Sequence, residues 1–233
     1  MQYVDSIEQL QLNLWNNRLK KKEVITLCDQ IISKLQNTVD IIQDAIVDSK
    51  AKIQEWKNRQ LLEPGADYQK RIEVFSTIAE YYDLNGRLTL LELDVETAYK
   101  YIFVAKTEYE YRFFARRLYT LMHVAEEGLV KPTGTLLPKL EKIVDIRYLE
   151  SYKNCHSALS KFISNNDKEL KTVRNSNEAH KKDKFEIQLG TIENISVAKS
   201  IQLIQEFTVL IYNLNASFLI MHGALSASLN KIC

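Results

Sequence analysis

The most chemically specific stretch of this sequence is a polar segment in which a histidine follows an arginine six positions later. Arg174 and His180 bound the run Arg-Asn-Ser-Asn-Glu-Ala-His, which contains no large apolar residue. An imidazole can exchange a proton with a ribose 2′-hydroxyl or a leaving oxygen near neutral pH. A guanidinium supplies fixed positive charge where a phosphate becomes more negative in a transition state. The two residue types together therefore suit RNA cleavage without a metal ion.

The spacing of this pair sets a geometric condition. On a continuous helix, residues six positions apart project about 120° from each other, so Arg174 and His180 would not share a face. Three features could bring them together: the long arginine stem, a local break at Asn175-Ser176-Asn177, and a dimer that places one subunit's arginine beside the other's histidine.

The same run resembles the signature of the HEPN superfamily, which is an arginine, a polar residue, four to six residues and a histidine. The resemblance implies a four- or five-helix bundle with the motif near the junction of its last two long helices. It also implies a metal-independent endoribonuclease, often a toxin or phage-defence effector with an antitoxin partner, that acts as a homodimer. Arg174 and His180 would then be catalytic, with Asn175 and Glu178 in supporting roles.

A second pair satisfies the same loose pattern, because Arg116 and Arg117 precede His123 by seven and six positions. His123 follows an apolar helical run, whereas His180 lies among Asn, Glu and Lys residues where a substrate could reach it. We therefore favour His180. The alternative is that His180 is an exposed histidine with no task, while Arg174 forms a salt bridge at a helix end.

Any site for a polyanion must be local, because the 31 basic and 30 acidic residues nearly cancel. Lys181, Lys182 and Lys184 directly follow the motif, and residues 161–184 contain seven basic and four acidic side chains. We expect these lysines to bind RNA phosphates. The alternative is an exposed, solvated loop.

Other chemistry leaves no signature in the sequence. There is no glycine-rich phosphate loop, no H-E-x-x-H pair and no G-x-S-x-G elbow. Cys28, Cys155 and Cys233 are far apart and form no C-x-x-C pair, which fits a reducing compartment. We expect no metal and no cofactor. The first residues have neither a basic region nor an apolar run, so we expect no signal peptide and a cytoplasmic location.

Only 6 Gly and 3 Pro occur in 233 residues, which favours helices over a many-stranded fold. An apolar heptad pattern predicts one long helix from Val24 to Trp56, stopped by Glu63-Pro64-Gly65 and packed as one face of a bundle. Leu84-Asn85-Gly86 predicts a turn. The remaining helices are expected at about 67–82, 88–127 (ending at Gly128), 136–170 and, beginning at Gly190-Thr191, 190–231.

Two of these helices have a second interpretation. The helix expected at about 88–127 contains an aromatic run with interleaved arginines. We predict that the aromatic side chains are buried and that the arginines lie at the rim. The alternative is that the run binds single-stranded nucleic acid. The last has no charged residue between Glu206 and Lys231. The second interpretation is that this length spans a bilayer. Because Asn, Ser and His residues interrupt the run, we expect instead a buried central helix of the bundle and no membrane partner. The aromatic run consists of Tyr109, Tyr111, Phe113, Phe114 and Tyr119, with Arg112, Arg116 and Arg117.

The sequence therefore predicts an all-α, up-and-down bundle of four to six helices, HEPN-like, with a long N-terminal heptad helix. We expect one domain over residues 1–233, in which residues 1–62 pack on a bundle core formed by residues 67–233. The functional hypothesis is a metal-independent endoribonuclease. The alternatives are a non-catalytic helical scaffold or adaptor and an RNA-binding protein with a degenerate HEPN site.

Overall fold

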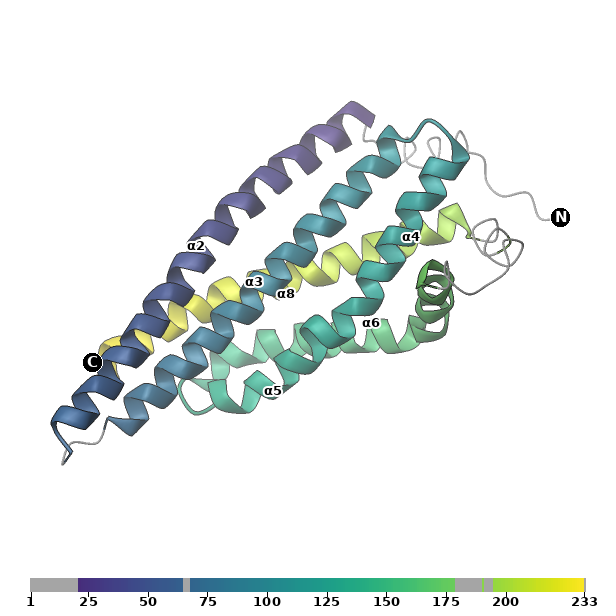
Figure 1. Cartoon of the computed structure of the whole chain (residues 1–233). Coiled ribbons are helices and arrows are strands. Elements are labelled where there is room, and N and C mark those ends of the chain that lie inside the picture. Colours follow the sequence, from purple (N-terminus) through teal and green to yellow (C-terminus); the bar gives the residue numbers. More distant parts are fainter. Residues whose placement is uncertain (1–20, 65–67, 179–189, 191–194, 233) are drawn as a thin grey trace.

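The computed structural model describes residues 21–64, 68–178, 190 and 195–232, and the elements formed by these residues are all helices (Figure 1). No strand occurs within the described ranges. The all-α prediction is therefore confirmed. Few glycines and prolines interrupt the chain, so long helices form and bury their apolar stripes against one another.

The first described helix, α2 (Lys21–Leu62), packs along α3 (Gln69–Val104) as a helical hairpin (Figure 1). The predicted heptad stripe is confirmed, because one buried residue recurs every seven positions and faces α3. The stripe also widens as expected, because Val24 is buried and Ile31 and Ala45 are half-buried, although α2 packs mainly on this single helix and leaves Ile41 and Val47 exposed. The buried residues of the seam are Cys28, Leu35, Ile42, Ser49 and Trp56.

The predicted turn at Leu84-Asn85-Gly86 is wrong, because α3 continues through it. Leu84, Asn85 and Leu88 are buried, and a β-carbon added to Gly86 would lie 3.4 Å from Cγ2 of Ile42. At this distance an added methyl group would make an ordinary contact with α2, so the position requires neither a turn nor a glycine.

The chain turns instead after Val104, and α4 (Glu108–Ala125) starts with a capping box that the sequence analysis missed. The backbone N–H of Glu110 donates to the Thr107 hydroxyl over 3.2 Å, and the Thr107 N–H donates to the Glu110 carboxylate over 3.2 Å. These two bonds satisfy backbone donors that the first helical turn leaves without intrahelical partners.

The predicted helix end at Gly128 is also wrong. The π-helical turn η1 (Glu126–Val130) joins α4 directly to α5 (Lys131–Leu140). Pro132 has no N–H to donate back along this continuous path, and the wider π-helical turn directly before α5 accommodates that gap. Burial of Leu129, Leu136 and Leu140 stabilises the continuation.

Two long helices complete the fold: α6 (Ile146–Glu178) and α8 (Val197–Ile232). Together with α3 and α4 they enclose the main core. At its centre the Tyr81 hydroxyl donates to the backbone carbonyl of Phe218 over 2.5 Å, and the two rings lie 5.1 Å apart. Tyr152 meets the edge of Phe218 at 5.1 Å. The described part of α8 begins later than the predicted start at Gly190-Thr191.

The two faces of α8 differ. Its inner face is fully buried at Phe207, Ile211 and Met221, as expected of a central helix. Its outer face exposes Val209 and Leu219, among other apolar residues. The segment Lys199–Ala227 is long and apolar enough to cross a membrane by length and composition, and 39% of its most apolar stretch is buried inside the protein.

Candidate functional site

Of the predicted site residues, the structure describes the side chain of Arg174, which is half-buried near the C-terminal end of α6. Asn175 and Glu178 belong to the last turn of this helix by their backbone. The pairing of Arg174 with His180 stays a prediction. His180, Lys181, Lys182 and Lys184 lie outside the described residues.

The local break that we predicted at Asn175-Ser176-Asn177 does not occur, because α6 is helical through Glu178. Leu159, Leu170 and Val173 continue one buried face to within one residue of Arg174. Packing of this face on α4 and α8 holds the helix in place beyond the point where the sequence becomes polar. Arg174 therefore projects from a packed helix, not from a loop.

The guanidinium of Arg174 contacts the histidine that the sequence analysis set aside. Its Nη1 lies 3.0 Å from Nε2 of His123, which belongs to α4 and is 8% exposed. A guanidinium only donates hydrogen bonds, so Nε2 must be the acceptor. His123 is then neutral with its proton on Nδ1 in this arrangement. Nδ1 is buried and has no hydrogen-bond partner within the described part of the chain.

Two further arginines lie on the same face of α4 as His123. Arg112 and Arg116 are each only 7% exposed, so the prediction that the arginines lie at the rim is wrong for these two, whereas Arg117 is exposed as predicted. Arg112 pairs with Glu108 at 2.6 Å. Burial lowers the pKa of Arg116, while the nearby Tyr109 phenol acts in the opposite direction. Arg112, Arg116 and His123 follow one another at spacings of four and seven residues, so their side chains lie on one stripe of the helix.

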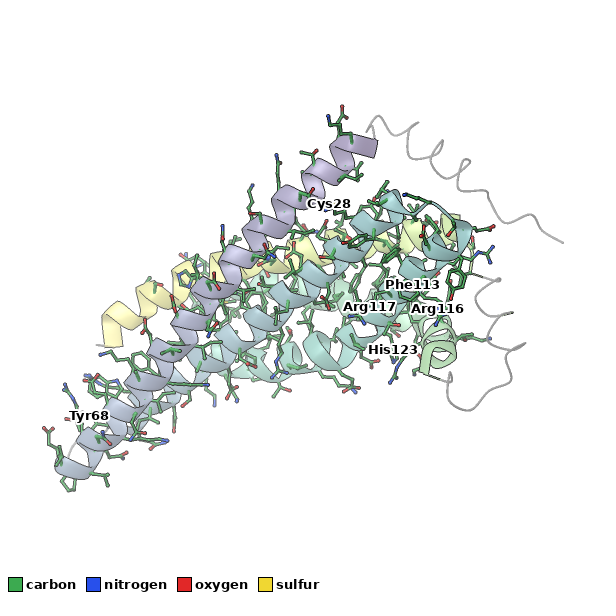
Figure 2. The ribbon with its side chains drawn as sticks, turned by 45° about the horizontal axis from the view of Figure 1, so that its top comes forward. Cys28, Tyr68, Phe113, Arg116, Arg117 and His123 are labelled. Carbon is green, nitrogen blue, oxygen red and sulfur yellow. The ribbon has the colours of Figure 1, made fainter. Side chains whose placement is uncertain are left out.

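The prediction that the aromatic residues are buried is correct for only part of the run. Tyr111 and Tyr119 are buried, whereas Tyr109 is 65% and Phe113 is 53% exposed. Figure 2 shows Phe113, Arg116 and His123 following one another along α4 toward the end of α6. Helical periodicity could not separate these alternatives, because aromatic and arginine residues alternate around the whole helix.

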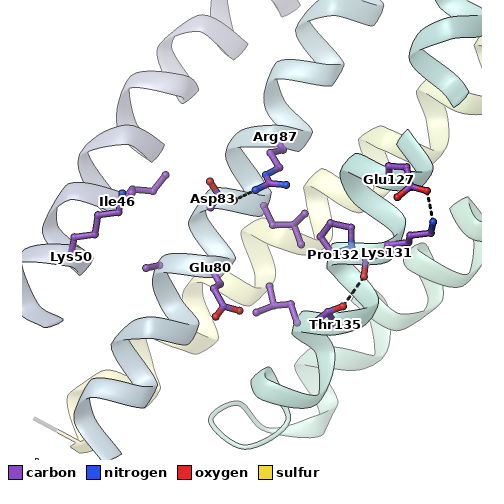
Figure 3. Close-up of a pocket in the computed structure, with 12 residues that line it drawn as sticks. Ile46, Lys50, Glu80, Asp83, Arg87, Glu127, Lys131, Pro132 and Thr135 are labelled. Atoms are coloured by element: carbon purple, nitrogen blue, oxygen red, sulfur yellow. Dashed lines mark hydrogen bonds and ion pairs between the residues drawn. The ribbon is translucent and has the colours of Figure 1, made fainter. Parts of the chain in front are cut away.

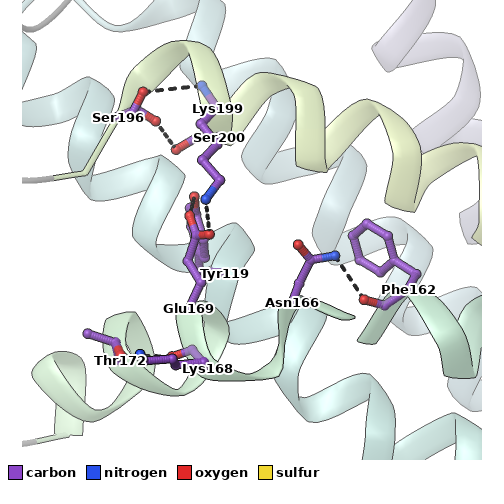
Figure 4. Close-up of polar contacts among 9 residues, drawn as sticks. All are labelled: Tyr119, Phe162, Asn166, Lys168, Glu169, Thr172, Ser196, Lys199 and Ser200. Atoms are coloured by element: carbon purple, nitrogen blue, oxygen red, sulfur yellow. Dashed lines mark hydrogen bonds and ion pairs between the residues drawn. The ribbon is translucent and has the colours of Figure 1, made fainter. Parts of the chain in front are cut away.

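A polar network holds the helix ends that surround Arg174. The Tyr119 hydroxyl donates to Glu169 over 2.9 Å, and Lys199 of α8 forms an ion pair with the same carboxylate (Figure 4). Burial raises the pKa of Tyr119, so its phenol remains a neutral donor. Ser200 packs beside it and donates its hydroxyl proton to the Ser196 carbonyl over 2.7 Å. One carboxylate thus links α4, α6 and α8 one turn before Arg174.

A separate cleft of about 540 Å³ lies between α2, α3 and α5, and neither Arg174 nor His123 lines it (Figure 3). Arg87 pairs with Asp83 at 2.7 Å, and Lys131 pairs with Glu127. Because opposite charges pair within the lining, the cleft presents no field of one sign to a charged ligand. No sequence motif pointed to it.

At the α4–α6 contact the guanidinium of Arg174 meets the His123 imidazole near the end of a packed helix, and a guanidinium is a suitable group for binding an anion. The described residues contain no group of three or more His, Cys, Asp or Glu side chains that could hold a metal ion. A scan of protein-family models, a search of curated proteins and a search of solved structures each returned no match for this chain.

Proposed function

We propose that this chain is a metal-independent endoribonuclease of HEPN type, with Arg174 and His180 as its catalytic residues. The observation that carries the proposal is the 3.0 Å contact between Arg174 and His123. The imidazole acceptor orients one nitrogen of the guanidinium at the end of α6, and a guanidinium held in this way would stabilise negative charge on a phosphate. His123 would be a positioning residue, because it is buried and acts through Arg174.

The proposed reaction is an internal transfer at one phosphate. The ribose 2′-oxygen forms a bond to phosphorus, the bond from phosphorus to the 5′-oxygen breaks, and the products carry a 2′,3′-cyclic phosphate and a 5′-hydroxyl. His180 would exchange the proton that leaves the 2′-hydroxyl and the proton that the 5′-oxygen gains. Arg174 would stabilise the added negative charge on the phosphoryl oxygens.

The other predicted residues would have supporting roles in this reaction. Asn175 would orient the arginine or the phosphate, and Glu178 would support the same turn of α6. Lys181, Lys182 and Lys184 would bind backbone phosphates of the RNA.

We also propose that the catalytic pair forms across a homodimer. Because α6 stays helical through Glu178, a separation of six residues favours pairing of one subunit's arginine with its partner's histidine. The resemblance of residues 174–180 to the HEPN signature further implies that the enzyme would be a toxin or phage-defence effector restrained by an antitoxin.

The test is cleavage of a labelled single-stranded RNA by the full chain in the presence of EDTA, with the product ends identified by mass spectrometry. We expect 2′,3′-cyclic phosphate ends, and a loss of about 100-fold or more in Arg174→Ala. Arg147→Ala is the control, because Arg147 is an exposed arginine at the other end of the same helix. Undiminished cleavage by His180→Ala would refute the proposal.

A second proposal is a non-enzymatic helical scaffold, and the exposed apolar face of α8 favours it. Val209, Tyr212 and Leu219 are 58%, 65% and 69% exposed on a helix that carries no charge between Glu206 and Lys231. Such faces mark assembly surfaces. Growth of cells that express wild type or Arg174→Ala separates the two proposals, because only a toxic nuclease would give different growth.

A further inference from the structure

The corner between α3 and α4 carries an exposed aromatic groove. Its volume is about 450 Å³, and it is distinct from the Arg174 contact. Tyr101 and Phe114 stack in parallel, with ring centroids 5.2 Å apart and planes 14° apart. Phe113 meets Phe114 edge-on at 5.3 Å. We define the aromatic groove by its lining, which consists of Tyr101, Val104, Ala105, Lys106, Tyr109, Glu110, Phe113 and Phe114.

The rings of this groove face solvent although buried positions lie close by on the same helices. Tyr101 is 44%, Tyr109 65% and Phe113 53% exposed. Nothing in the helix start requires them, since the capping box formed by Thr107 and Glu110 begins α4 without aromatic side chains. Exposed aromatic faces of this kind bind flat ligands by stacking.

The charge around the groove is basic. Residues 106–117 contain four basic and two acidic side chains. Glu108 pairs with the buried Arg112 at 2.6 Å, Arg117 pairs with Asp94 of α3 at 3.4 Å, and Glu110 accepts backbone N–H groups at the helix start. The remaining excess of positive charge is small. Lys106 lines the groove, and Arg116 interacts with Tyr109. A ligand with flat faces and negative charge complements this surface.

We propose that the aromatic groove stacks the unpaired bases of single-stranded RNA. The choice of RNA over other base-carrying ligands rests on the proposed function, whereas stacking in the groove does not require cleavage. Phe113 and His123 are ten positions apart on α4, about 15 Å along the helix axis. A single strand lying along α4 would therefore reach from the groove past Arg116 toward Arg174. A second protein copy fits less well, because a stable interface needs a far larger surface than this small, charged corner.

The test is binding of a fluorescein-labelled, 2′-deoxy-2′-fluoro oligonucleotide to the full chain, measured by fluorescence anisotropy. This probe has no 2′-hydroxyl to attack the phosphate, so binding is measured whether or not the chain is a nuclease. We expect Phe113→Ala and Tyr109→Ala to weaken binding about fivefold or more, and Phe113→Trp to retain it. Both replaced side chains are exposed, so the fold should persist, which circular dichroism checks.

The control is Tyr212→Ala, because Tyr212 on α8 is as exposed as Tyr109, at 65%. It should bind like wild type, and a duplex of the same sequence should bind more weakly than the single strand. The inference is overturned if Phe113→Ala binds like wild type, if Tyr212→Ala weakens binding equally, or if the duplex binds as tightly. It is also overturned if Phe113→Ala changes the oligomeric state in step with the affinity, since the groove would then be an interface between copies.

Discussion

The contact between Arg174 and His123 predicts a measurable coupling between two helices. His123→Leu removes the acceptor, Arg174→Met removes the guanidinium but keeps much of the stem, and the double variant removes both. Hydrogen bonds to charged groups contribute about 1.5–3 kcal/mol. Arg174 is half-buried, so water competes for its donors, and we expect a coupling of about 1.5–2 kcal/mol, at the lower end of that range.

Neither single variant would report this value by itself. Nδ1 of His123 is buried without a partner among the described residues, and a buried donor left unsatisfied costs about 1–3 kcal/mol. His123→Leu removes that cost together with the favourable bond, so the two effects on the free energy of unfolding oppose each other. The double-mutant cycle cancels the cost that belongs to His123 alone and leaves the interaction with Arg174.

The assay is urea unfolding of the four proteins, followed by circular dichroism and accepted only where the m-values agree. A control cycle pairs His123→Leu with Arg147→Met, because Arg147 lies 27 positions before Arg174 on α6, about 40 Å along the axis. The control cycle should show no coupling. If the Arg174 cycle gave the same value as the control, the guanidinium would not be held by His123, and the proposed positioning role would fall.

Two further predictions concern the helices that support the site. Gly86→Ala should raise the free energy of unfolding by about 1 kcal/mol and the Tm by about 2–4 °C in a thermal scan, because alanine favours the helix and its methyl group meets Ile42 at an ordinary contact distance. Destabilisation would instead mean that α2 packs too closely on α3 for a β-carbon at this position. Burial, and to a smaller extent the nearby charge of Glu92, raises the pKa of Glu96 above its usual 4.5. The protonated form of Glu96 therefore stabilises the fold fully below pH 4.5, and this stability is lost as the pH rises through the higher pKa of the folded state. Glu96→Gln should therefore gain stability relative to wild type between pH 4 and 7 in urea titrations, and a pH-independent difference would contradict the assignment.

Much of the helical framework was predictable because its signals are local. The heptad positions from Cys28 to Trp56 lie on one stripe at any helical geometry, so the sequence specifies both a long helix and its buried face. The helix boundaries were less predictable. Gly86 and Gly128 are helix breakers in isolation, yet burial of their neighbours against other helices outweighs a propensity penalty of about 1 kcal/mol at each position.

The candidate site, too, could be predicted from the sequence only in part. The sequence identified Arg174, and it also supplied His123, but as the partner of Arg116 or Arg117 on the same helix. A contact between α4 and α6 joins residues 51 positions apart, and no periodicity encodes such a distance. The burial of Arg112 and Arg116 was likewise invisible, because the aromatic and arginine positions share one helical period.

Local patterns in the sequence are sufficient to predict that the chain is helical, where its long heptad helix lies, and which residue types could act on a phosphate. Packing between helices decides which of them continue through glycine and proline, which arginines are buried, and which histidine contacts Arg174. The physical reason is that periodicity and capping act within about one or two helical turns, whereas burial and pairing depend on the helix that packs from elsewhere in the chain.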